Sequence, residues 1–320
     1  MSGATKLTWP IEGLDLTEAF GLVKPEATGA KRLILKLSTA SGDYALKGAV
    51  ITPKKLKDWN FVLDFLHTSQ FTDYVGPLKT KDGRYFIQVK DKSYSLMPWF
   101  AGRECRLNAP EDTLIYAQTL GRLHQTTGRI ASNKRTWPQH WRQKVLELQA
   151  LEHSCKPVNP ELAALIPAAI DAGKTALSLC QNKAVNDIQA KPLVICHHDL
   201  TYRNFLISPQ GTGYLIDFDM ATPDTPARDL AQLLLNTLKA NHWLPQSALP
   251  LIHAYAEEYP LTQGELGLAL AFMSFPRSLW SLPKRLEPDS GNDPVALTRQ
   301  VKSALSRQTC VHSLSKLLGI

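Results

Sequence analysis

Cysteine is scarce in this sequence, and its few copies are not arranged as a disulfide or zinc framework. The five cysteines are Cys105, Cys155, Cys180, Cys196 and Cys310. They are odd in number and far apart, and no two of them form a C-x-x-C pair. We interpret them as reduced thiols, which predicts a cytoplasmic protein.

Long apolar runs are also missing. No run approaches the roughly 18 to 20 residues that a membrane-spanning helix needs, so we expect no membrane span. Residues 1–16 lack a basic patch followed by an apolar segment, so we expect no secretory signal there. The 320-residue chain is 44% hydrophobic and 20% charged, which is typical of a globular protein and excludes a collagen-like rod or a coiled coil.

Dense blocks of one charge sign are absent, although the net charge is positive. The 36 Lys and Arg residues exceed the 29 Asp and Glu residues, which gives a formal net charge of +7 at pH 7. Basic chains can bind nucleic acid, but here the basic residues are dispersed and form no strip interleaved with aromatic residues. We therefore predict an ordinary basic surface and no nucleic-acid partner.

The first hundred residues are rich in predicted strands. Alternating apolar residues predict strands over 31–38, 44–51, 74–80, 84–90 and 93–97. The Asp82-Gly83 pair predicts a hairpin turn between the third and fourth of these strands. Apolar residues at three- and four-residue spacing predict one helix, over 53–69.

From residue 98 onward the pattern is mostly helical. Helical spacing predicts helices over 111–128, 139–153, 160–181, 226–240, 246–258, 262–280 and 293–318. One strand cluster interrupts them, over 192–196, 204–208 and 214–218. This order predicts a two-lobed α+β enzyme with its site in the crevice between the lobes. The predicted lobes are residues 1–97 and 98–320, with a hinge near 97–100.

The segment 196–219 carries the polar residues that point to chemistry. It reads CHHDLTYRNFLISPQGTGYLIDFD, which contains the pattern His197-x-Asp199-x4-Asn204 and a D-F-D triplet that begins at Asp217. Asn204 opens one predicted strand and Asp217 ends the next. We therefore expect a tight hairpin to bring Asp199, Asn204 and Asp217 onto one rim.

Such a rim is suited to phosphoryl transfer. The transition state of this reaction is highly charged at oxygen, so catalysis consists mostly of positioning and of charge neutralisation by a metal. One carboxylate must orient the attacking hydroxyl and accept its proton, and we assign this role to Asp199. A hard cation such as Mg²⁺ needs oxygen ligands, and we assign Asn204 and Asp217 as those ligands.

The segment resembles the catalytic and metal-binding loops of the aminoglycoside phosphotransferase and choline kinase superfamily. Further motifs carry the resemblance along the chain: TKDGRYF at 80–86, YSLMPWFAGREC at 94–105, LGRLH at 120–124, RDLAQLL at 228–234, and YPLTQGEL with SFPRSLW within 259–280. Within the superfamily the chain looks most like the CotS-type spore-coat branch. The resemblance implies a protein-kinase-like fold, with a small antiparallel-sheet lobe that carries one helix and a larger, mostly helical lobe. It also implies ATP and Mg²⁺ as cofactors.

The resemblance assigns further residues to nucleotide binding. Lys47, in YALKGA, occupies the place of the lysine that contacts the α- and β-phosphates. Asp58 is the nearest match to the helix glutamate that pairs with this lysine, and it is one methylene shorter. Met97 and Trp99 flank Pro98 in the hinge that recognises adenine through its backbone, and Pro98 itself has no N–H to donate.

Other residues near the motif have structural readings. We expect His197 to bond the backbone of the catalytic loop and Asp229 to brace that loop, whereas His198 faces solvent. Asp219 either helps to hold a second Mg²⁺ or bonds nearby backbone. The tryptophans of the helical region suggest an aromatic box, but packing within the core is the better reading for most of them.

The spacing of the motifs limits the acceptor. Only eleven residues separate Asp217 from Asp229, and no Ala-Pro-Glu follows, so the platform that a protein kinase offers to a peptide is missing. We therefore predict transfer to a hydroxyl of a small molecule. A chain of charge +7 without a dense acidic run does not favour a polycationic aminoglycoside. The alternative is a non-catalytic nucleotide-binding or coat-assembly protein that keeps the fold. The sequence indicates no oligomeric state.

Overall fold

The structure is a computed structural model, and it describes residues 9–31, 34–128, 130–131, 137–154, 160–181, 192–287 and 291–320. The backbone forms two compact units. The first contains the described residues up to Cys105 together with Tyr202–Thr222, and the second contains Arg106–Thr201 and Pro223–Ile320. The lobe boundary at residues 97–98 remains a prediction.

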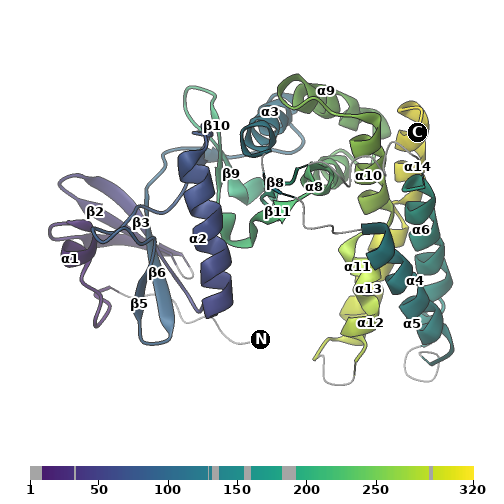
Figure 1. Cartoon of the computed structure of the whole chain (residues 1–320), viewed down its shortest axis with the longest axis horizontal. Helices are drawn as coiled ribbons and strands as arrows, with labels where there is room; N and C mark the ends of the chain where they lie inside the picture. The colour runs from purple at the N-terminus through teal and green to yellow at the C-terminus, as the bar shows by residue number, and fades with distance from the viewer. Residues whose placement is uncertain are drawn as a thin grey trace. The chain divides into compact units, whose positions relative to one another are not determined.

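The first unit is built on a five-stranded sheet (Figure 1). Its strands lie in the order β1 (Glu26–Lys31), β2 (Ile34–Thr39), β3 (Gly42–Ala49), β6 (Lys92–Pro98) and β5 (Ile87–Val89). Every neighbouring pair is antiparallel. Alternation places Leu35, Leu37, Leu46 and Leu96 on one buried face, where α1 (Leu16–Phe20) adds Leu16.

The helix predicted over 53–69 is present as α2 (Pro53–Thr68). The Thr52 side chain caps its first turn, and Pro53 occupies the first helical position, where no backbone N–H is needed. Its buried residues are Trp59, Val62, Leu63 and Leu66. Trp59 stacks on Phe86 with ring centroids 4.7 Å apart. This spacing gives α2 an apolar face.

A second sheet in this unit corrects the predicted hairpin at 74–90. Its strands lie in the order β4 (Tyr74–Val75), β10 (Gly213–Ile216), β9 (Phe205–Ile207) and β7 (Arg103–Glu104). The turn at Asp82-Gly83 is real, since Gly83 has φ of +82° and donates to the Thr80 carbonyl. The strands beside it do not pair with each other, however, because β4 pairs with β10 and β5 pairs with β6. Pairing with distant strands has overridden the local turn signal.

The second unit is mostly helical (Figure 1). Its helices are α3 (Pro110–Thr127), α4 (Trp137–Ser154), α5 (Pro160–Ala163), α6 (Ile166–Leu179), α8 (Pro226–Ala240), η3 (Pro245–Ala248), α9 (Leu249–Glu258), α10 (Gln263–Ser274), α11 (Arg277–Trp280), α12 (Leu282–Arg285), α13 (Pro294–Leu305) and α14 (Gln308–Leu317). The strands β8 (Val194–Cys196) and β11 (Thr222–Asp224) pair beside them. Gly121 lets α3 approach α9 closely, because a Cβ at this position would lie 2.8 Å from the Cβ of Glu258.

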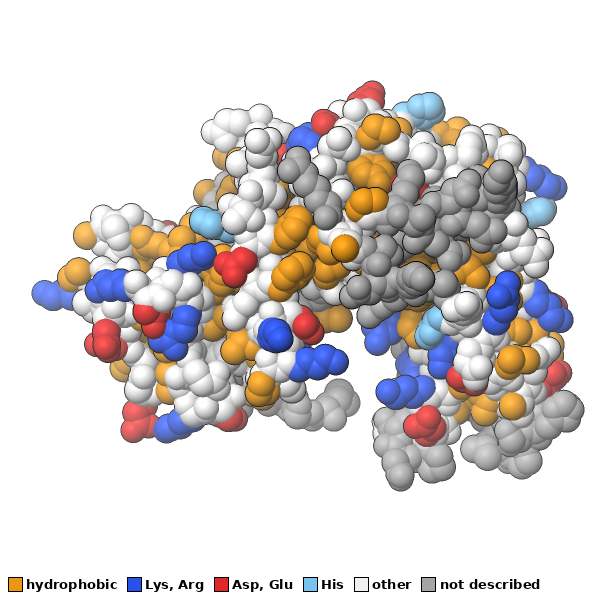
Figure 2. Space-filling model, in the orientation of Figure 1, with side chains coloured by type: hydrophobic (Ala, Val, Ile, Leu, Met, Phe, Trp, Pro, Cys, Tyr) orange, Lys and Arg blue, Asp and Glu red, His pale blue; other side chains and the backbone are white. Residues whose placement is uncertain are grey.

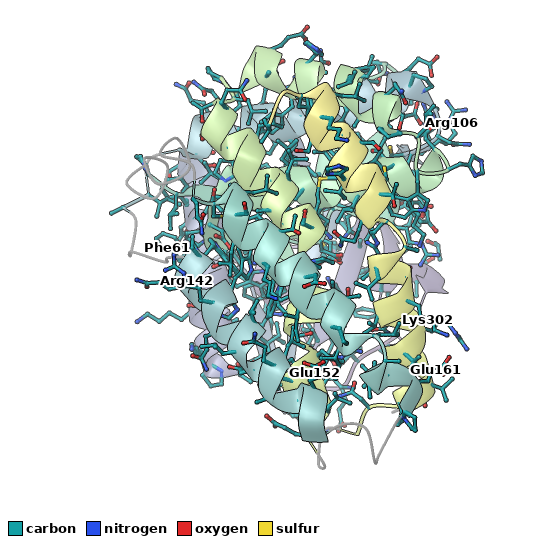
Figure 3. The ribbon with its side chains drawn as sticks, turned by 90° about the vertical axis from the view of Figure 1, so that its right-hand side faces the viewer. Phe61, Arg106, Arg142, Glu152, Glu161 and Lys302 are labelled. Carbon is teal, nitrogen blue, oxygen red and sulfur yellow. The ribbon has the colours of Figure 1, made fainter. Side chains whose placement is uncertain are left out.

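One apolar stretch is longer than we expected from the sequence. Pro160–Leu179 is long and apolar enough, by length and composition alone, to cross a membrane. The core helix of a globular protein passes the same test, and in this unit α6 packs against α4 and α10. At the start of this stretch, Glu161 of α5 forms an ion pair with Lys302 of α13 (Figure 3).

The element order confirms the expected fold class. The chain has a two-lobed, protein-kinase-like α+β fold, with an antiparallel sheet and one long helix in the N-terminal part and a helical C-terminal part.

On the face drawn in Figure 2, Lys and Arg side chains are interspersed with Asp and Glu side chains.

Candidate functional site

The first unit contains a cavity of about 360 Å³ that lies beside the five-stranded sheet. Residues of β3 and β6, including Ala45 and Ser95, line one wall, and Trp59 and Leu63 of α2 line another. The chain from Met97 to Phe100 and the end of β10 complete the lining. The volume lies within the range typical of small-molecule and cofactor sites.

Lys47 and two carboxylates lie together in this cavity. The Lys47 Nζ donates to Asp217 Oδ1 at 2.8 Å and to Asp219 Oδ2 at 2.7 Å. Burial lowers the pKa of Lys47, but the two carboxylates outweigh this effect, so the pKa is raised and the ammonium stays charged. Burial, together with the neighbouring Asp217, raises the pKa of Asp219 to about 6 in spite of Lys47.

The β9–β10 hairpin places Asn204 and Asp217 at the same end of the second sheet. Phe205 pairs with Leu215, so Asn204 directly precedes one strand and Asp217 directly follows its partner. Asp217 has φ of +66°, a left-handed conformation that is uncommon for a residue other than glycine. Asn204 is 8% exposed. The hairpin predicted from the sequence is therefore present, and it brings these two oxygen-bearing side chains to one edge.

Asp58 does not meet Lys47 in this structure. It is exposed on α2, and among the described residues its side chain has no ion pair. The next residue, Trp59, points to the cavity and donates its Nε1–H to the Phe218 carbonyl at 2.9 Å. The cavity-facing positions of α2 are thus apolar, and the counter-charges of Lys47 come from Asp217 and Asp219. The pairing of Asp58 with Lys47 stays a prediction.

The backbone beside Pro98 shows which groups face the cavity. The Trp99 N–H donates to the Asp43 carbonyl in β3 at 2.9 Å, and the Leu96 carbonyl accepts from the Leu78 N–H on the opposite side at 2.7 Å. Because N–H and C=O directions alternate along an extended chain, the Pro98 carbonyl points away from β3. Met97 and Trp99 line the cavity as predicted, but the Trp99 N–H is already occupied. Phe100 lies two residues after Pro98, so in an extended chain its backbone N–H points to the same side as the Pro98 carbonyl. Phe100 was not predicted as a site residue.

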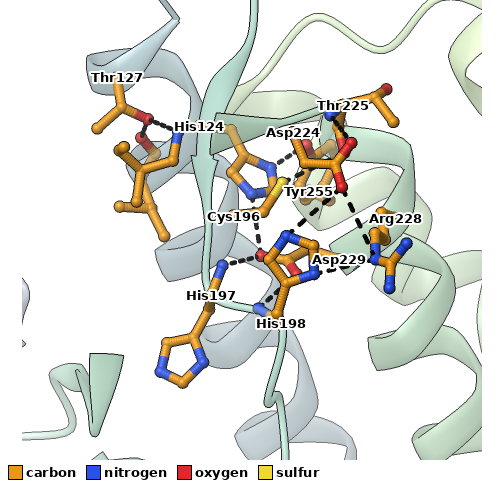
Figure 4. A network of polar contacts seen from close by, with 12 residues as sticks. His124, Thr127, Cys196, His197, His198, Asp224, Thr225, Arg228, Asp229 and Tyr255 are labelled. Atoms are coloured by element: carbon orange, nitrogen blue, oxygen red, sulfur yellow. Dashed lines mark hydrogen bonds and ion pairs between the residues drawn. The ribbon is translucent and has the colours of Figure 1, made fainter. Parts of the chain in front are cut away.

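The second unit holds the catalytic-loop motif in a buried polar network (Figure 4). Asp229, at the start of α8, is fully buried and accepts the backbone N–H groups of His197 and His198 at 2.6 and 2.9 Å. Its other contact is His124 Nε2 at 3.4 Å, and His124 Nδ1 lies 2.6 Å from the Tyr255 hydroxyl. Burial alone raises the pKa of Asp229, but the hydrogen bond from His124 and the nearby imidazoles hold it well below its usual value. The expectation that Asp229 braces the loop is confirmed.

Two histidines of the loop behave differently. His197 is fully buried and its Nδ1 accepts the Asp199 N–H at 3.3 Å, as expected for a structural residue. The expectation that His198 faces solvent is wrong, because its side chain is only 10% exposed. Its Nδ1 accepts from Arg228 Nε at 2.9 Å, and its φ of +63° explains why glycine suits this position (Figure 4).

Asp199 follows this braced pair and is half-buried. Its N–H is held by His197 and its carbonyl accepts the Thr201 N–H at 2.8 Å, so the backbone on both sides of the carboxylate is fixed. Asp199 belongs to the second unit, whereas Asn204 and Asp217 belong to the first. The juxtaposition of all three residues on one rim therefore stays a prediction.

The donor set of the first unit fits a metal–phosphate ligand. Asp217, Asp219 and Asn204 offer oxygen atoms, which are the ligands that Mg²⁺ prefers, and Lys47 supplies a half-buried positive charge beside Asp217 and Asp219. Sequence reasoning left Asp219 between two roles, because a pattern of residue types does not show that a lysine 172 positions away will reach it.

Comparison with known proteins agrees with these observations. Residues 28–266 match the phosphotransferase enzyme family. An aminoglycoside phosphotransferase from Alicyclobacillus acidocaldarius is 20% identical with a TM-score of 0.74, over 94% of this chain and 93% of that chain. Choline kinase LicA from Streptococcus pneumoniae is 18% identical with a TM-score of 0.53, over 89% and 94% of the two chains.

A spectinomycin phosphotransferase, solved in complex with ADP and spectinomycin, is 15% identical with a TM-score of 0.62, over 93% of this chain and 97% of that chain. At these identities the structures show the fold that they share with this chain. The family match covers well over half of the sequence, including Lys47, Asp199 and Asp217. On this match the chain belongs to the phosphotransferase enzyme family.

Proposed function

We propose that this protein transfers the γ-phosphate of ATP to a hydroxyl group of a small molecule, in a reaction that depends on Mg²⁺. The observation that carries the proposal is the meeting of Lys47 with Asp217 and Asp219 in a mostly apolar cavity. Withdrawing three charged groups partly from water at one place is costly unless they pair with each other or bind a ligand. A metal–triphosphate ligand supplies matching charges for all three.

The base of the nucleotide would lie against the edge of β6. The Pro98 carbonyl would accept a hydrogen bond from the base, and two residues further on the Phe100 N–H would donate one to it. Adenine presents a matching amino donor and ring-nitrogen acceptor, whereas guanine presents a carbonyl and a ring N–H in the same places. The predicted adenine contact at Met97–Trp99 is thus refined to the backbone groups on either side of Trp99. The edge favours ATP over GTP.

The phosphate end would lie at Lys47, with Asp217 and Asn204 as the metal ligands and Asp219 beside them. Bound Mg²⁺ neutralises charge on the transferred phosphoryl group and on its leaving oxygen. The protein's own part is to fix these oxygen ligands, and the β9–β10 hairpin does so for Asn204 and Asp217. The predicted pairing of Asp58 with Lys47 would need a rotation of α2 about its own axis that turns Asp58 toward the cavity.

Asp199 would act as the base that orients the acceptor hydroxyl and accepts its proton. Its position is set by the His197 side chain and, one step behind, by Asp229. The short connection from Asp217 to the start of α8 at Pro226 contains η2 (Phe218–Met220) and β11 as its regular elements, too little for a peptide platform. The acceptor is therefore a small molecule. A polycationic aminoglycoside is not favoured as the acceptor. The likeness to the CotS-type branch rests on sequence motifs alone.

The test of this function is Asp199→Asn, which keeps the shape of the side chain and removes its basic oxygen. Phosphoryl transfer to an acceptor found in a radiolabelled γ-phosphate screen should fall by about 10²- to 10⁴-fold. The affinity for MgATP, measured by calorimetry, should change little, because the nucleotide contacts belong to the other unit. Asp171→Asn, an exposed acid on α6, is the matched control.

A variant with undiminished turnover would remove Asp199 from the mechanism. A wild-type protein that binds MgATP but transfers phosphate to no acceptor would favour the non-catalytic, nucleotide-binding alternative.

A further inference from the structure

Arg228 is held in an unusual environment for an arginine that bonds no carboxylate closely. Its guanidinium carbon lies 4.8 Å from the ring centroid of Trp137 and 5.7 Å from that of Phe272. Its Nε donates to His198 Nδ1 at 2.9 Å (Figure 4). Two aromatic faces and one directed hydrogen bond therefore fix both the place and the plane of the guanidinium.

Most of the hydrogen-bonding capacity of this guanidinium is unused. Arginine has five N–H donors, of which Nε carries one. Among the described residues, neither Nη atom of Arg228 has a hydrogen bond, and the closest atoms of its ion pair with Asp224 are Nε and Oδ2 at 3.8 Å. The side chain is 23% exposed, so a ligand can reach it from solvent.

The charge of Arg228 is only partly compensated. Its hydrogen-bond partner His198 is neutral at pH 7, because burial lowers the pKa of that imidazole. The nearest carboxylate oxygen, Asp224 Oδ2, lies 3.8 Å away on the Nε side. The other oxygen of Asp224 is used by the Trp137 Nε1–H and the Thr225 N–H. The Nη edge of the guanidinium thus remains a preorganised site for an anion with two oxygens.

His198 links this site to the proposed catalytic base. Arg228 bonds His198, and His198 is covalently followed by Asp199. We propose that Arg228 binds a carboxylate or phosphate group of the acceptor and so presents the acceptor's hydroxyl to Asp199. This inference rests on the proposed function and names its substrate class: small hydroxyl compounds that carry an anionic group. Trp137 and Phe272 hold the arginine and are positioning residues in this arrangement.

The test compares three probes with the same three-carbon skeleton: the neutral glycerol, the carboxylate glycerate and the phosphate ester glycerol 3-phosphate. Binding to the intact protein is measured by calorimetry without nucleotide. At least one anionic probe should bind about 10- to 100-fold more tightly than glycerol, the range expected for charged hydrogen bonds to a fixed guanidinium. The tighter of the two anionic probes distinguishes a carboxylate site from a phosphate site.

Arg228→Met keeps much of the apolar stem and should abolish this preference, whereas Arg228→Lys keeps the charge and should retain part of it. Arg142→Met changes the charge equally on an exposed position of α4 and should leave the preference intact (Figure 3). If Arg228 only braces His198, its replacement lowers binding of all probes alike. That result, or a wild-type protein without preference for anions, would overturn the inference.

The two proposals fail separately in this design. Anion binding that depends on Arg228, in a protein that never transfers phosphate, supports the present inference and contradicts the proposed function. Transfer to neutral acceptors with no gain from an anionic group supports the function and contradicts the inference.

Discussion

Replacing Asp229 should destabilise the second unit more than any exposed substitution. Its carboxylate is fully buried and accepts two backbone N–H groups, from His197 and His198. In Asp229→Ala both donors lose a charged acceptor in a place that water does not reach. Each such loss costs about 1.5–3 kcal/mol, so we expect a decrease of about 3–6 kcal/mol in the free energy of unfolding.

Asp229→Asn separates the charge from the geometry. Asparagine keeps one accepting oxygen, but its NH₂ group faces a backbone donor, so about half of the loss, roughly 1.5–3 kcal/mol, should remain. Urea denaturation of the full chain measures these differences from the transition midpoints. Asp171→Asn, whose carboxylate is exposed, should stay within about 0.5 kcal/mol of wild type.

The same variants also report on function. Because Asp229 holds the backbone that carries Asp199, turnover should fall in the order wild type, Asn, Ala, whereas the affinity of the other unit for MgADP should not follow this order. An Asp229→Ala protein within about 1 kcal/mol of wild type would refute the reasoning, since a buried pair of N–H groups cannot lose its acceptor so cheaply.

Two further predictions concern single side chains. Lys47→Ala should weaken binding of ATP far more than binding of adenosine in calorimetry, because the ammonium meets phosphate, and Asp58→Asn should produce only a small version of this effect. Equal losses for ATP and adenosine would indicate general damage to the sheet. Burial lowers the pKa of His198 from 6.5, so the unfolded chain takes up a proton below that pH and the folded chain resists it. Stability contributed by this group is therefore complete above pH 6.5 and is lost as the pH falls below it through the lowered pKa, and His198→Gly should flatten that slope in thermal unfolding.

Local patterns in the sequence predicted much of the fold. The helix at 53–69 and the β9–β10 hairpin depend on apolar spacing and on a turn within their own segments, and both are present. The strand β1, at Glu26–Lys31, was missed because EATGAK has no strong apolar alternation and is held mainly by its pairing with β2. The hairpin predicted over 74–90 is wrong for a related reason. Its turn signal is local, but pairing with distant strands decides where β4 and β5 lie.

The candidate site likewise contains residues that the sequence predicted and residues whose surroundings it could not predict. Lys47 and Asp217 were identified from motifs, and their side chains meet in the cavity. Such motifs identify site residues because each one places its polar residue at a fixed point of a strand or turn. The environment of His198 could not be predicted, because it depends on Arg228, which lies thirty residues further along the chain. Contacts of that kind are set by tertiary packing and leave no periodic mark in the sequence.

The left-handed backbone at His198 and Asp217 limits how these positions can change over evolutionary time. Both have φ above +60°, where a Cβ is disfavoured and where glycine, asparagine and aspartate are tolerated best. A mutational path that passes through alanine or a β-branched residue at either position strains the backbone in addition to removing the side chain. Neutral drift is therefore confined to a few residue types at these two points. An exchange of His198 for glycine relieves the strain but leaves the Nε–H of Arg228 without its acceptor. Positions 198 and 228 are therefore expected to change together.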